Sequence, residues 1–283
     1  MKRLALFVLL VAPASARADV ELLSWLPVDS ASVTGAPKAR VPFLAGLARG
    51  FEVGGKRLPA CWSKVTGPAD SSYQVWRTPP DPTAALLVHG RLDRSAIEAC
   101  LTQSFRILQR AVKLTREGAL TQLDGPEDSW LGWTGEWVLW HPDRARVEAL
   151  LAALEKGPGK PSPLAEPLRR VNPATELWIA STVDYTKRLL GVSSRSMVGW
   201  LAMTEGGLSM PVAFEFKSPA DAERAAAAVE AKRTDENFRA VLRAALVSTK
   251  VTRQRHFLTF DLDPKVWMTP ETMEAIGALI NEK

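Results

Sequence analysis

Histidine is the side chain best suited to acid–base chemistry near neutral pH, and the chain contains three. His89 precedes Arg91 and Asp93 in a segment whose strand-like alternation places all three on one face. His141 precedes Asp143, so each of these two histidines has a carboxylate nearby that could orient it as a general base. The two aspartates also fit as helix N-caps, which is a structural role. A hydrolase that uses His141 or His89 is therefore one interpretation of the chain.

Sequence motifs of known catalytic or metal-binding chemistry are missing. The chain has no Gly-x-Ser-x-Gly nucleophile elbow, no Cys-x-x-Cys redox pair and no His-Glu-x-x-His metal motif. The stretch from Gly157 to Lys160 resembles part of a phosphate loop, but it lacks the full spacing and the following Ser or Thr. We therefore expect no catalytic residue, no metal site and no cofactor.

Four closely spaced tryptophans form a candidate aromatic surface, namely Trp130, Trp133, Trp137 and Trp140. Glycines between them disfavour a helix, so we expect a hairpin that divides the four between both of its faces. Exposed aromatic rings could stack against sugars or a partner surface. The alternative is that these rings fill the core of the sheet, which is the more usual role of large aromatic side chains.

The N-terminus has the features of a secretory signal peptide. A basic start and the apolar run 4–12 precede Ala16-Arg17-Ala18, a small-x-small pattern that predicts cleavage after Ala18. The apolar run is shorter than the ~20 residues that span a membrane, so we expect no transmembrane segment after cleavage. Removing Lys2, Arg3 and Arg17 lowers the formal charge from +5 to +2. The expected location is periplasmic or secreted, and the low charge predicts no nucleic-acid partner.

Cys61 and Cys100 are the two cysteines of the chain. An even number of cysteines in an exported protein favours a disulfide, and the alternative is a pair of buried free thiols. We expect the disulfide.

The pattern of apolar residues and turn signals predicts an α+β protein. The expected strands cover 32–35, 73–77, 84–92, 112–117, 119–123, 130–133, 137–140, 176–181, 197–204, 208–217, 249–255 and 256–262. The expected helices cover 43–51, 94–105, 144–155, 185–190, 219–232 and 237–246, and Thr269-Pro270-Glu271 begins a last one. Ser218 is the expected N-cap of 219–232, with Pro219 at its first position. After the signal peptide 1–18, we expect a first α+β half at 19–156, a linker at 157–173 and a second half at 174–283.

The two halves show internal similarity. Residues 113–116 (Lys-Leu-Thr-Arg) match residues 250–253 (Lys-Val-Thr-Arg), and both segments follow a long helix that itself follows an apolar strand. This order indicates a duplicated unit. We expect each half to form an antiparallel sheet with helices packed on one face, because strands and helices do not alternate strictly.

The start of the mature chain carries a family resemblance. Residues 26–33 (LPVDSASV) resemble the Leu-Pro-x-Asp-Ala-x-x-Val start of exported proteins that occur in myxobacteria and related Gram-negative bacteria. Gly90-Arg91-Leu92-Asp93 fits the helix start that follows in those proteins. The resemblance implies export and a duplicated α+β architecture, and it assigns no catalytic or binding residue.

The sequence thus favours an exported, non-enzymatic protein that acts by binding. The expected partner is a protein, an envelope component or a small ligand, of unknown identity. The hydrolase interpretation is one alternative, and a structural subunit of an envelope assembly is another. The subunit interpretation predicts a large exposed apolar or aromatic patch.

Overall fold

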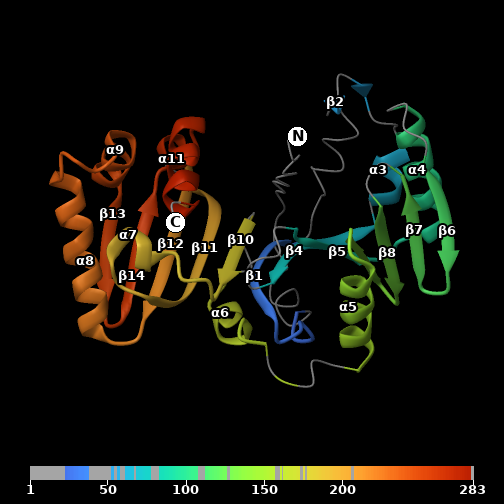
Figure 1. The fold of residues 1–283 in the computed structure, drawn as a ribbon, viewed down its shortest axis with the longest axis horizontal. Helices are drawn as coiled ribbons and strands as arrows, with labels where there is room; N and C mark the ends of the chain where they lie inside the picture. The colour runs from blue at the N-terminus through green and yellow to red at the C-terminus, as the bar shows by residue number, and fades with distance from the viewer. Residues whose placement is uncertain are drawn as a thin grey trace. The chain divides into compact units, whose positions relative to one another are not determined.

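The computed structural model describes residues 23–37, 52–53, 56–57, 61–66, 68–77, 83–107, 112–125, 128–156, 160, 162–172, 175, 177–204 and 207–281. The chain divides into two compact units, and each of them combines antiparallel strands with helices (Figure 1). Unit 1 comprises residues 1–165 and 173–177, and unit 2 comprises 166–172 and 178–283. The expected signal peptide and the expected helix at 43–51 lie outside the described residues.

The sheet of unit 1 is antiparallel throughout the pairings described, in the order β1-β4-β5-β9-β8-β7-β6. Its strands in chain order are β1 (Ser30–Pro37), β4 (Ala69–Arg77), β5 (Ala85–Gly90), β6 (Lys113–Glu117), β7 (Leu120–Asp124), β8 (Ser129–Thr134) and β9 (Trp137–His141). A separate short pair joins β2 (Glu52–Val53) to β3 (Lys56–Arg57).

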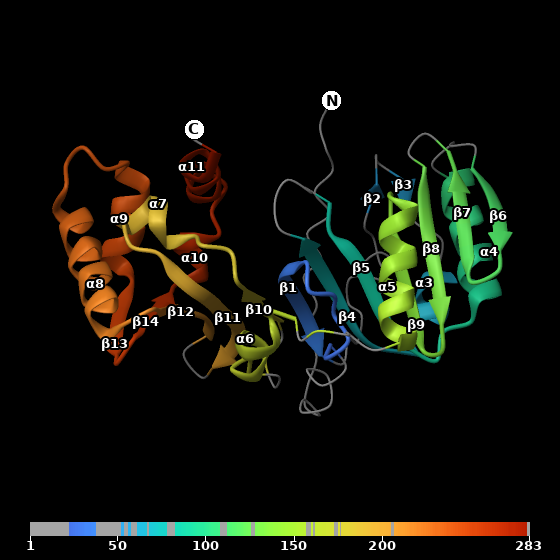
Figure 2. The same cartoon turned by 60° about the horizontal axis from the view of Figure 1, so that its bottom comes forward.

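Helices cover both faces of this sheet. Helices α3 (Cys61–Thr66) and α4 (Arg94–Ile107) contribute to an apolar cluster with Leu131 of β8. Helix α5 (Arg144–Lys156) lies on the opposite face (Figure 2), against Gly132, the next residue of the strand. A Cβ atom at Gly132 would lie 2.6 Å from Val147 Cγ1, so the glycine permits the close approach of α5.

Capping side chains and turn glycines account for the ends of these helices and strands. The Asp93 carboxylate accepts a hydrogen bond from Ala96 N at 3.1 Å, and Asp143 accepts one from Ala145 N at 3.0 Å. Both aspartates are therefore N-caps, as expected. Gly118 and Gly135 adopt φ values of +60° and +51° in the β6–β7 and β8–β9 turns, where glycine is favoured.

Unit 2 has a sheet in the order β10-β11-β12-β14-β13. Its elements are β10 (Leu177–Ser181), α7 (Thr186–Leu190), β11 (Ser194–Thr204), β12 (Gly207–Phe216), α8 (Pro219–Thr234), α9 (Ala240–Ser248), β13 (Lys250–Gln254), β14 (Phe257–Leu262), α10 (Pro264–Trp267) and α11 (Pro270–Asn281). Residues of α7, α8 and α9 bury apolar side chains against Phe216, Leu258 and Phe260. Ser218 caps α8 by accepting from Asp221 N at 3.1 Å, with Pro219 in the first turn, as the sequence predicts.

The segment expected to be a linker, 157–173, is partly structured. It contains α6 (Ala165–Arg169), and Leu164 and Leu168 are buried. Burial of these two apolar side chains is favourable, and it explains why the described part of this segment is folded instead of forming a solvated connection.

The two units share a topology. In unit 1, β1, β4, β5 and β9 are neighbours in that order, and in unit 2, β10, β11, β12 and β14 are neighbours in the same order. In each unit, a helix (α4 or α8) follows the second hairpin strand. The matched segments 113–116 and 250–253 occupy end strands, but β13 adjoins β14, whereas β7 and β8 separate β6 from β9. Strand β8 is therefore the topological counterpart of β13, and unit 1 has one additional hairpin.

A disulfide connects Cys61 of α3 to Cys100 of α4, with 5.8 Å between their Cα atoms. Cys100 is buried in the same apolar cluster as Val65 and Ile97. The expected pairing is present, and no free cysteine remains.

Reducing this disulfide should lower the free energy of unfolding by about 4 kcal/mol, because it releases a closed loop of roughly 40 residues in the unfolded chain. Denaturant unfolding of the oxidised and reduced protein measures the difference. The Cys61→Ser/Cys100→Ser variant is the control, and it should show no response to reductant. Equal stability of the oxidised and reduced wild-type forms would contradict the assignment.

Candidate functional site

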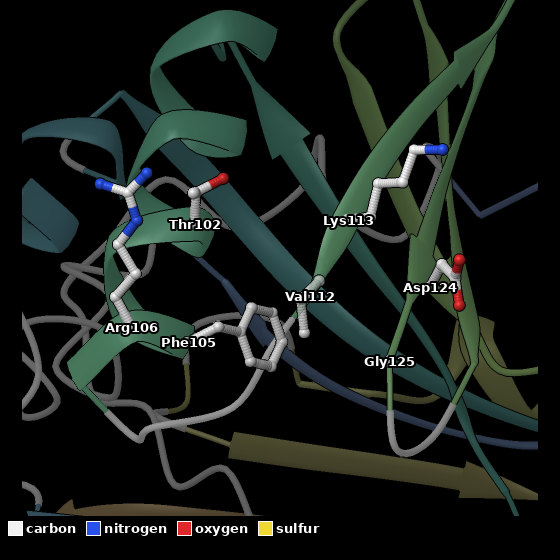
Figure 3. Close-up of a pocket in the computed structure, with 7 residues that line it drawn as sticks. All are labelled: Thr102, Phe105, Arg106, Val112, Lys113, Asp124 and Gly125. Carbon is white, nitrogen blue, oxygen red and sulfur yellow. The ribbon is translucent and has the colours of Figure 1, made fainter.

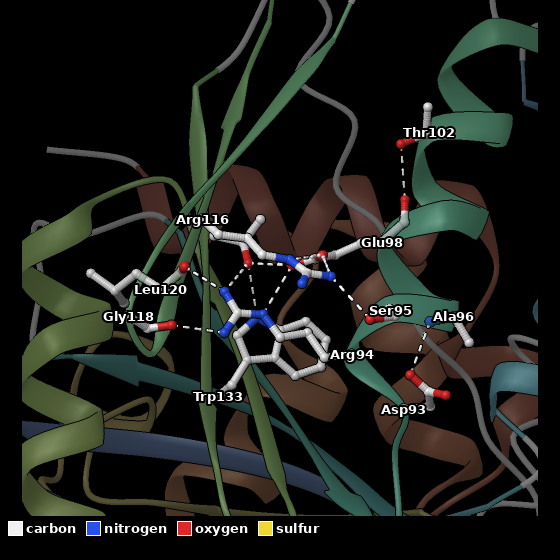
Figure 4. Close-up of polar contacts among 11 residues, drawn as sticks. Asp93, Arg94, Ser95, Ala96, Glu98, Thr102, Arg116, Gly118, Leu120 and Trp133 are labelled. Carbon is white, nitrogen blue, oxygen red and sulfur yellow. Dashed lines mark hydrogen bonds and ion pairs between the residues drawn. The ribbon is translucent and has the colours of Figure 1, made fainter.

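A buried carboxylate is the centre of the polar network in unit 1. The Glu98 side chain of α4 is 7% exposed. Arg94 Nε donates to Glu98 Oε1 at 3.0 Å, and Arg116 Nε donates to Glu98 Oε2 at 2.7 Å (Figure 4). The Thr121 hydroxyl also donates to Glu98 Oε1. Three donors from α4, β6 and β7 thus converge on one carboxylate.

The same network fixes the β6–β7 hairpin to α4. Arg94 donates from its terminal nitrogens to the carbonyl oxygens of Gly118 at 2.8 Å and Leu120 at 2.7 Å. Trp133 Nε1 donates to Thr121 Oγ1 at 3.1 Å, and the Arg94 guanidinium lies 5.5 Å from the Trp133 ring centre. The turn carbonyls, the strand hydroxyl and the helix carboxylate are therefore all hydrogen-bonded within one connected set.

Burial raises the pKa of Glu98, but hydrogen bonds from Thr121, Arg116 and Arg94 outweigh it and hold the pKa below its usual value. The carboxylate is ionised near neutral pH and occupied by these donors. The Glu98 carboxylate therefore has a structural role, which is to join α4 to the β6–β7 hairpin.

Unit 2 repeats one contact of this network at the surface. Glu98 is the fifth residue after the N-cap Asp93, and Glu223 is the fifth residue after the N-cap Ser218. Glu223 pairs with Arg253 of β13 at 3.2 Å, but its side chain is 72% exposed. A helix-to-strand ion pair thus occurs in both units, and its carboxylate is buried in unit 1 alone.

His141 has a structural role at the start of α5. Its side chain is buried, and Asp143 N donates to its Nδ1 at 3.0 Å. Because Nδ1 accepts this bond, the neutral ring carries its proton on Nε2, which lies 3.4 Å from the Thr83 carbonyl oxygen. Both ring nitrogens of His141 therefore lie against backbone groups of the fold.

His89 lies between two carboxylates that the sequence analysis did not identify. Its Nε2 is 3.3 Å from Glu136 Oε2, and its Nδ1 is 3.6 Å from Asp70 Oδ2. Its ring centre lies 4.9 Å from that of Trp137. Asp93, the carboxylate expected to orient His89, instead caps α4. Sequence reasoning missed Asp70 and Glu136 because strand pairing, and not spacing along the chain, brings them to His89.

The four tryptophans do not form one aromatic surface. The ladder pairs Leu131 with Trp140 and Trp133 with Val138, which places Trp133 and Trp140 on the α4 face. Trp130 and Trp137 lie on the α5 face, where Trp137 is 9% exposed and Trp130 packs under Arg144. The hairpin prediction is confirmed, and the strand pleat divides the four rings between its two faces, as expected.

An open cleft lies at the C-terminal end of α4 (Figure 3). It has a volume of about 560 Å³ and is lined by Thr102, Phe105, Arg106, Val112, Lys113, Asp124 and Gly125. Phe105 and Val112 also pack against the apolar cluster of unit 1, so they form an apolar wall. The side chains of Arg106 and Lys113 are exposed. Neither side chain makes an ion pair or a hydrogen bond with the part of the chain that the structure describes.

An ion pair between a buried arginine and an exposed aspartate was also not predicted. Arg146 of α5 is 3% exposed, and its guanidinium donates to both carboxylate oxygens of Asp29 at 3.0 Å. Asp29 belongs to the segment LPVDSASV at residues 26–33. The two residues are 117 positions apart, so no local pattern indicates their contact.

Two further properties concern metals and membranes. Across the described ranges, no three His, Cys, Asp or Glu residues gather in a way that could hold a metal ion. No helix within those ranges has the length and apolar character needed to cross a membrane.

Comparison with known proteins relates the chain to others by fold. No protein-family model matches it, and a search of curated proteins finds no match. Two solved structures of TP0453, a Treponema protein, are similar to it at 11% sequence identity. Crystal form I gives a TM-score of 0.52 over 91% of this chain and 96% of that chain, and crystal form III gives 0.51 over 84% and 91%. The similarity shows a shared α+β fold.

Replacing Glu98 with Gln should lower the free energy of unfolding by about 2 kcal/mol at pH 7, because the buried carboxylate on which three hydrogen-bond donors converge loses its charge. The matched Glu223→Gln variant removes an exposed pair and should cost less than about 0.5 kcal/mol. Denaturant unfolding of both variants measures the contrast. Equal losses would contradict the structural role of Glu98.

The lowered pKa of Glu98 also predicts a pH dependence. Its stabilisation is complete above the unfolded-state value of 4.5 and is lost as the pH falls through the lower folded-state pKa. Wild-type stability should therefore decrease on acidification below about pH 4.5 more steeply than that of Glu98→Gln. Parallel pH profiles for the two proteins would be the contrary result.

Proposed function

We propose that the protein is an exported, non-enzymatic binding protein and that the cleft at the end of α4 is its ligand site. The observation that carries this proposal is a cleft of about 560 Å³ beside charged groups that are not used elsewhere in the described fold. Small-molecule sites typically have volumes of about 300–1,000 Å³, with apolar walls and a few polar groups. By contrast, the polar network of unit 1 already forms hydrogen bonds within the fold, between α4 and the β6–β7 hairpin. It uses the side chains of Glu98, Arg94 and Arg116.

The walls of the cleft favour a small acid with an apolar body. Phe105 and Val112 offer the apolar wall against which such a body would pack. Lys113 lies directly opposite Asp124 across the β6–β7 ladder, so a negatively charged side chain neighbours it and makes it the less suitable partner for an acidic ligand. Arg106 belongs to α4, its side chain makes no ion pair with the described residues, and a guanidinium is well suited to binding an acidic group. We therefore assign the recognition of the acidic group to Arg106.

We also propose a periplasmic or secreted location. The signal-peptide pattern of residues 1–18 supports it, and so does the disulfide, because disulfides persist in oxidising compartments.

Fluorescence titration with dansylglycine and its neutral amide tests the ligand site, since the two probes share one aromatic body and differ in one charge. The acid should bind about fivefold more tightly than the amide, as expected for one partly exposed ion pair. Arg106→Gln should abolish this preference. Arg91→Gln makes the same charge change at a side chain that is 92% exposed and outside the cleft, and it should preserve the preference.

Equal affinity for the two probes, or a preference that survives Arg106→Gln, would contradict the assignment of the cleft. Failure of both probes to bind would also contradict it.

A further inference from the structure

Strand β6 is an open sheet edge. It is an end strand of the unit 1 sheet, and β7 is its one strand neighbour among the described residues. Figures 1 and 2 both place β6 at the outer end of that sheet. An open edge presents unpaired backbone donors and acceptors to another strand.

The hairpin turn determines which backbone groups face outward. Glu117 pairs with Leu120 across the two-residue turn at Gly118 and Ala119. The residues that close such a turn exchange backbone hydrogen bonds, and hydrogen-bonded pairs then alternate along the ladder. Lys113, Thr115 and Glu117 therefore direct their N–H and C=O groups to β7. Leu114 and Arg116 direct theirs to the open side.

We propose that β6 is a homodimer interface, at which β6 of a second copy of this chain adds antiparallel about a two-fold axis through Thr115. In this register Leu114 lies opposite Arg116 of the second copy, so the outward backbone groups meet as hydrogen-bonded pairs. Lys113 lies opposite Glu117 of the second copy, and the symmetry produces this ion pair twice.

The positions of the side chains support the same register. Glu117 is on the α5 face, because its carboxylate binds Arg144 at 2.8 Å, and Lys113 and Thr115 share that face by alternation. The Glu117 side chain is 39% exposed, and a carboxylate can accept bonds from two cations. Opposite charges directly across a ladder are stabilising, and so are facing threonines. An axis at Lys113 or at Glu117 would instead oppose like charges.

The end strand of unit 2 lacks this complementarity. In β13, Lys250, Thr252 and Gln254 lie at the same distances from the hairpin turn as Lys113, Thr115 and Glu117 in β6. The same symmetric pairing there would place Lys250 opposite a glutamine, without an ion pair. Glu117 therefore distinguishes β6 from β13, and charge complementarity selects β6 as the self-pairing edge.

Sedimentation velocity of the disulfide-bonded protein tests the proposal. Wild type should form a dimer whose dissociation constant rises with salt, because partly exposed ion pairs are screened. Glu117→Gln makes β6 resemble β13 and should raise the dissociation constant about fivefold by removing both pairs. Lys250→Glu makes a comparable change on β13 and should leave the dimer unaltered.

A charge-swap mixture gives the decisive result. Lys113→Glu and Glu117→Lys should each be monomeric, because each places like charges opposite one another. Mixed together, they should form a heterodimer in which both opposed pairs again have opposite charges. Circular dichroism of each variant verifies that it is folded. A monomeric wild type at all concentrations overturns the proposal, and so does a dimer that is indifferent to these substitutions.

Discussion

Burial of the Glu98 carboxylate is the constraint on which much of unit 1 depends. An ionised carboxylate is costly to remove from water unless hydrogen-bond donors replace the solvent. Here the donors come from the first turn of α4, from β6 and from β7. The Glu98 charge therefore has its hydrogen-bond donors only when α4 and the β6–β7 hairpin are correctly placed against each other. Arg94 extends the same requirement to the turn by binding the carbonyl oxygens of Gly118 and Leu120.

The two surfaces that we propose for binding both follow from this arrangement. The cleft lies between the end of α4 and the strands of the hairpin, so its walls are positioned by the contacts at the other end of the helix. Strand β6 is held by Arg116 and Glu117, which bind α4 and α5 on opposite faces of the sheet. Two-sided attachment keeps an end strand ordered while leaving its outer backbone groups unpaired, as strand addition requires. Unit 2 has the counterpart pair Glu223–Arg253 at the surface, where it contributes less.

The sequence predicts those parts of the fold that depend on neighbouring residues. Asp93, Asp143 and Ser218 were recognisable as N-caps, and the strand ranges followed from apolar alternation between glycine turns. The sites were harder to predict because they depend on pairing between distant segments. Thr121 reaches Glu98 across 23 positions, and Asp29 reaches Arg146 across 117. The tryptophans illustrate the same limit, since their division between two faces followed from strand alternation, but the helix that covers each face depended on tertiary packing.

Hydrogen exchange of Glu98→Gln, read by mass spectrometry, tests the central claim that this carboxylate holds the hairpin in place. Backbone amides in 113–124 should lose at least about tenfold protection relative to wild type, because local opening of the hairpin becomes easier. Amides in 257–262 of unit 2 should be unchanged, and Glu223→Gln should leave both segments protected. Unchanged protection of 113–124 in a folded Glu98→Gln protein would contradict the account.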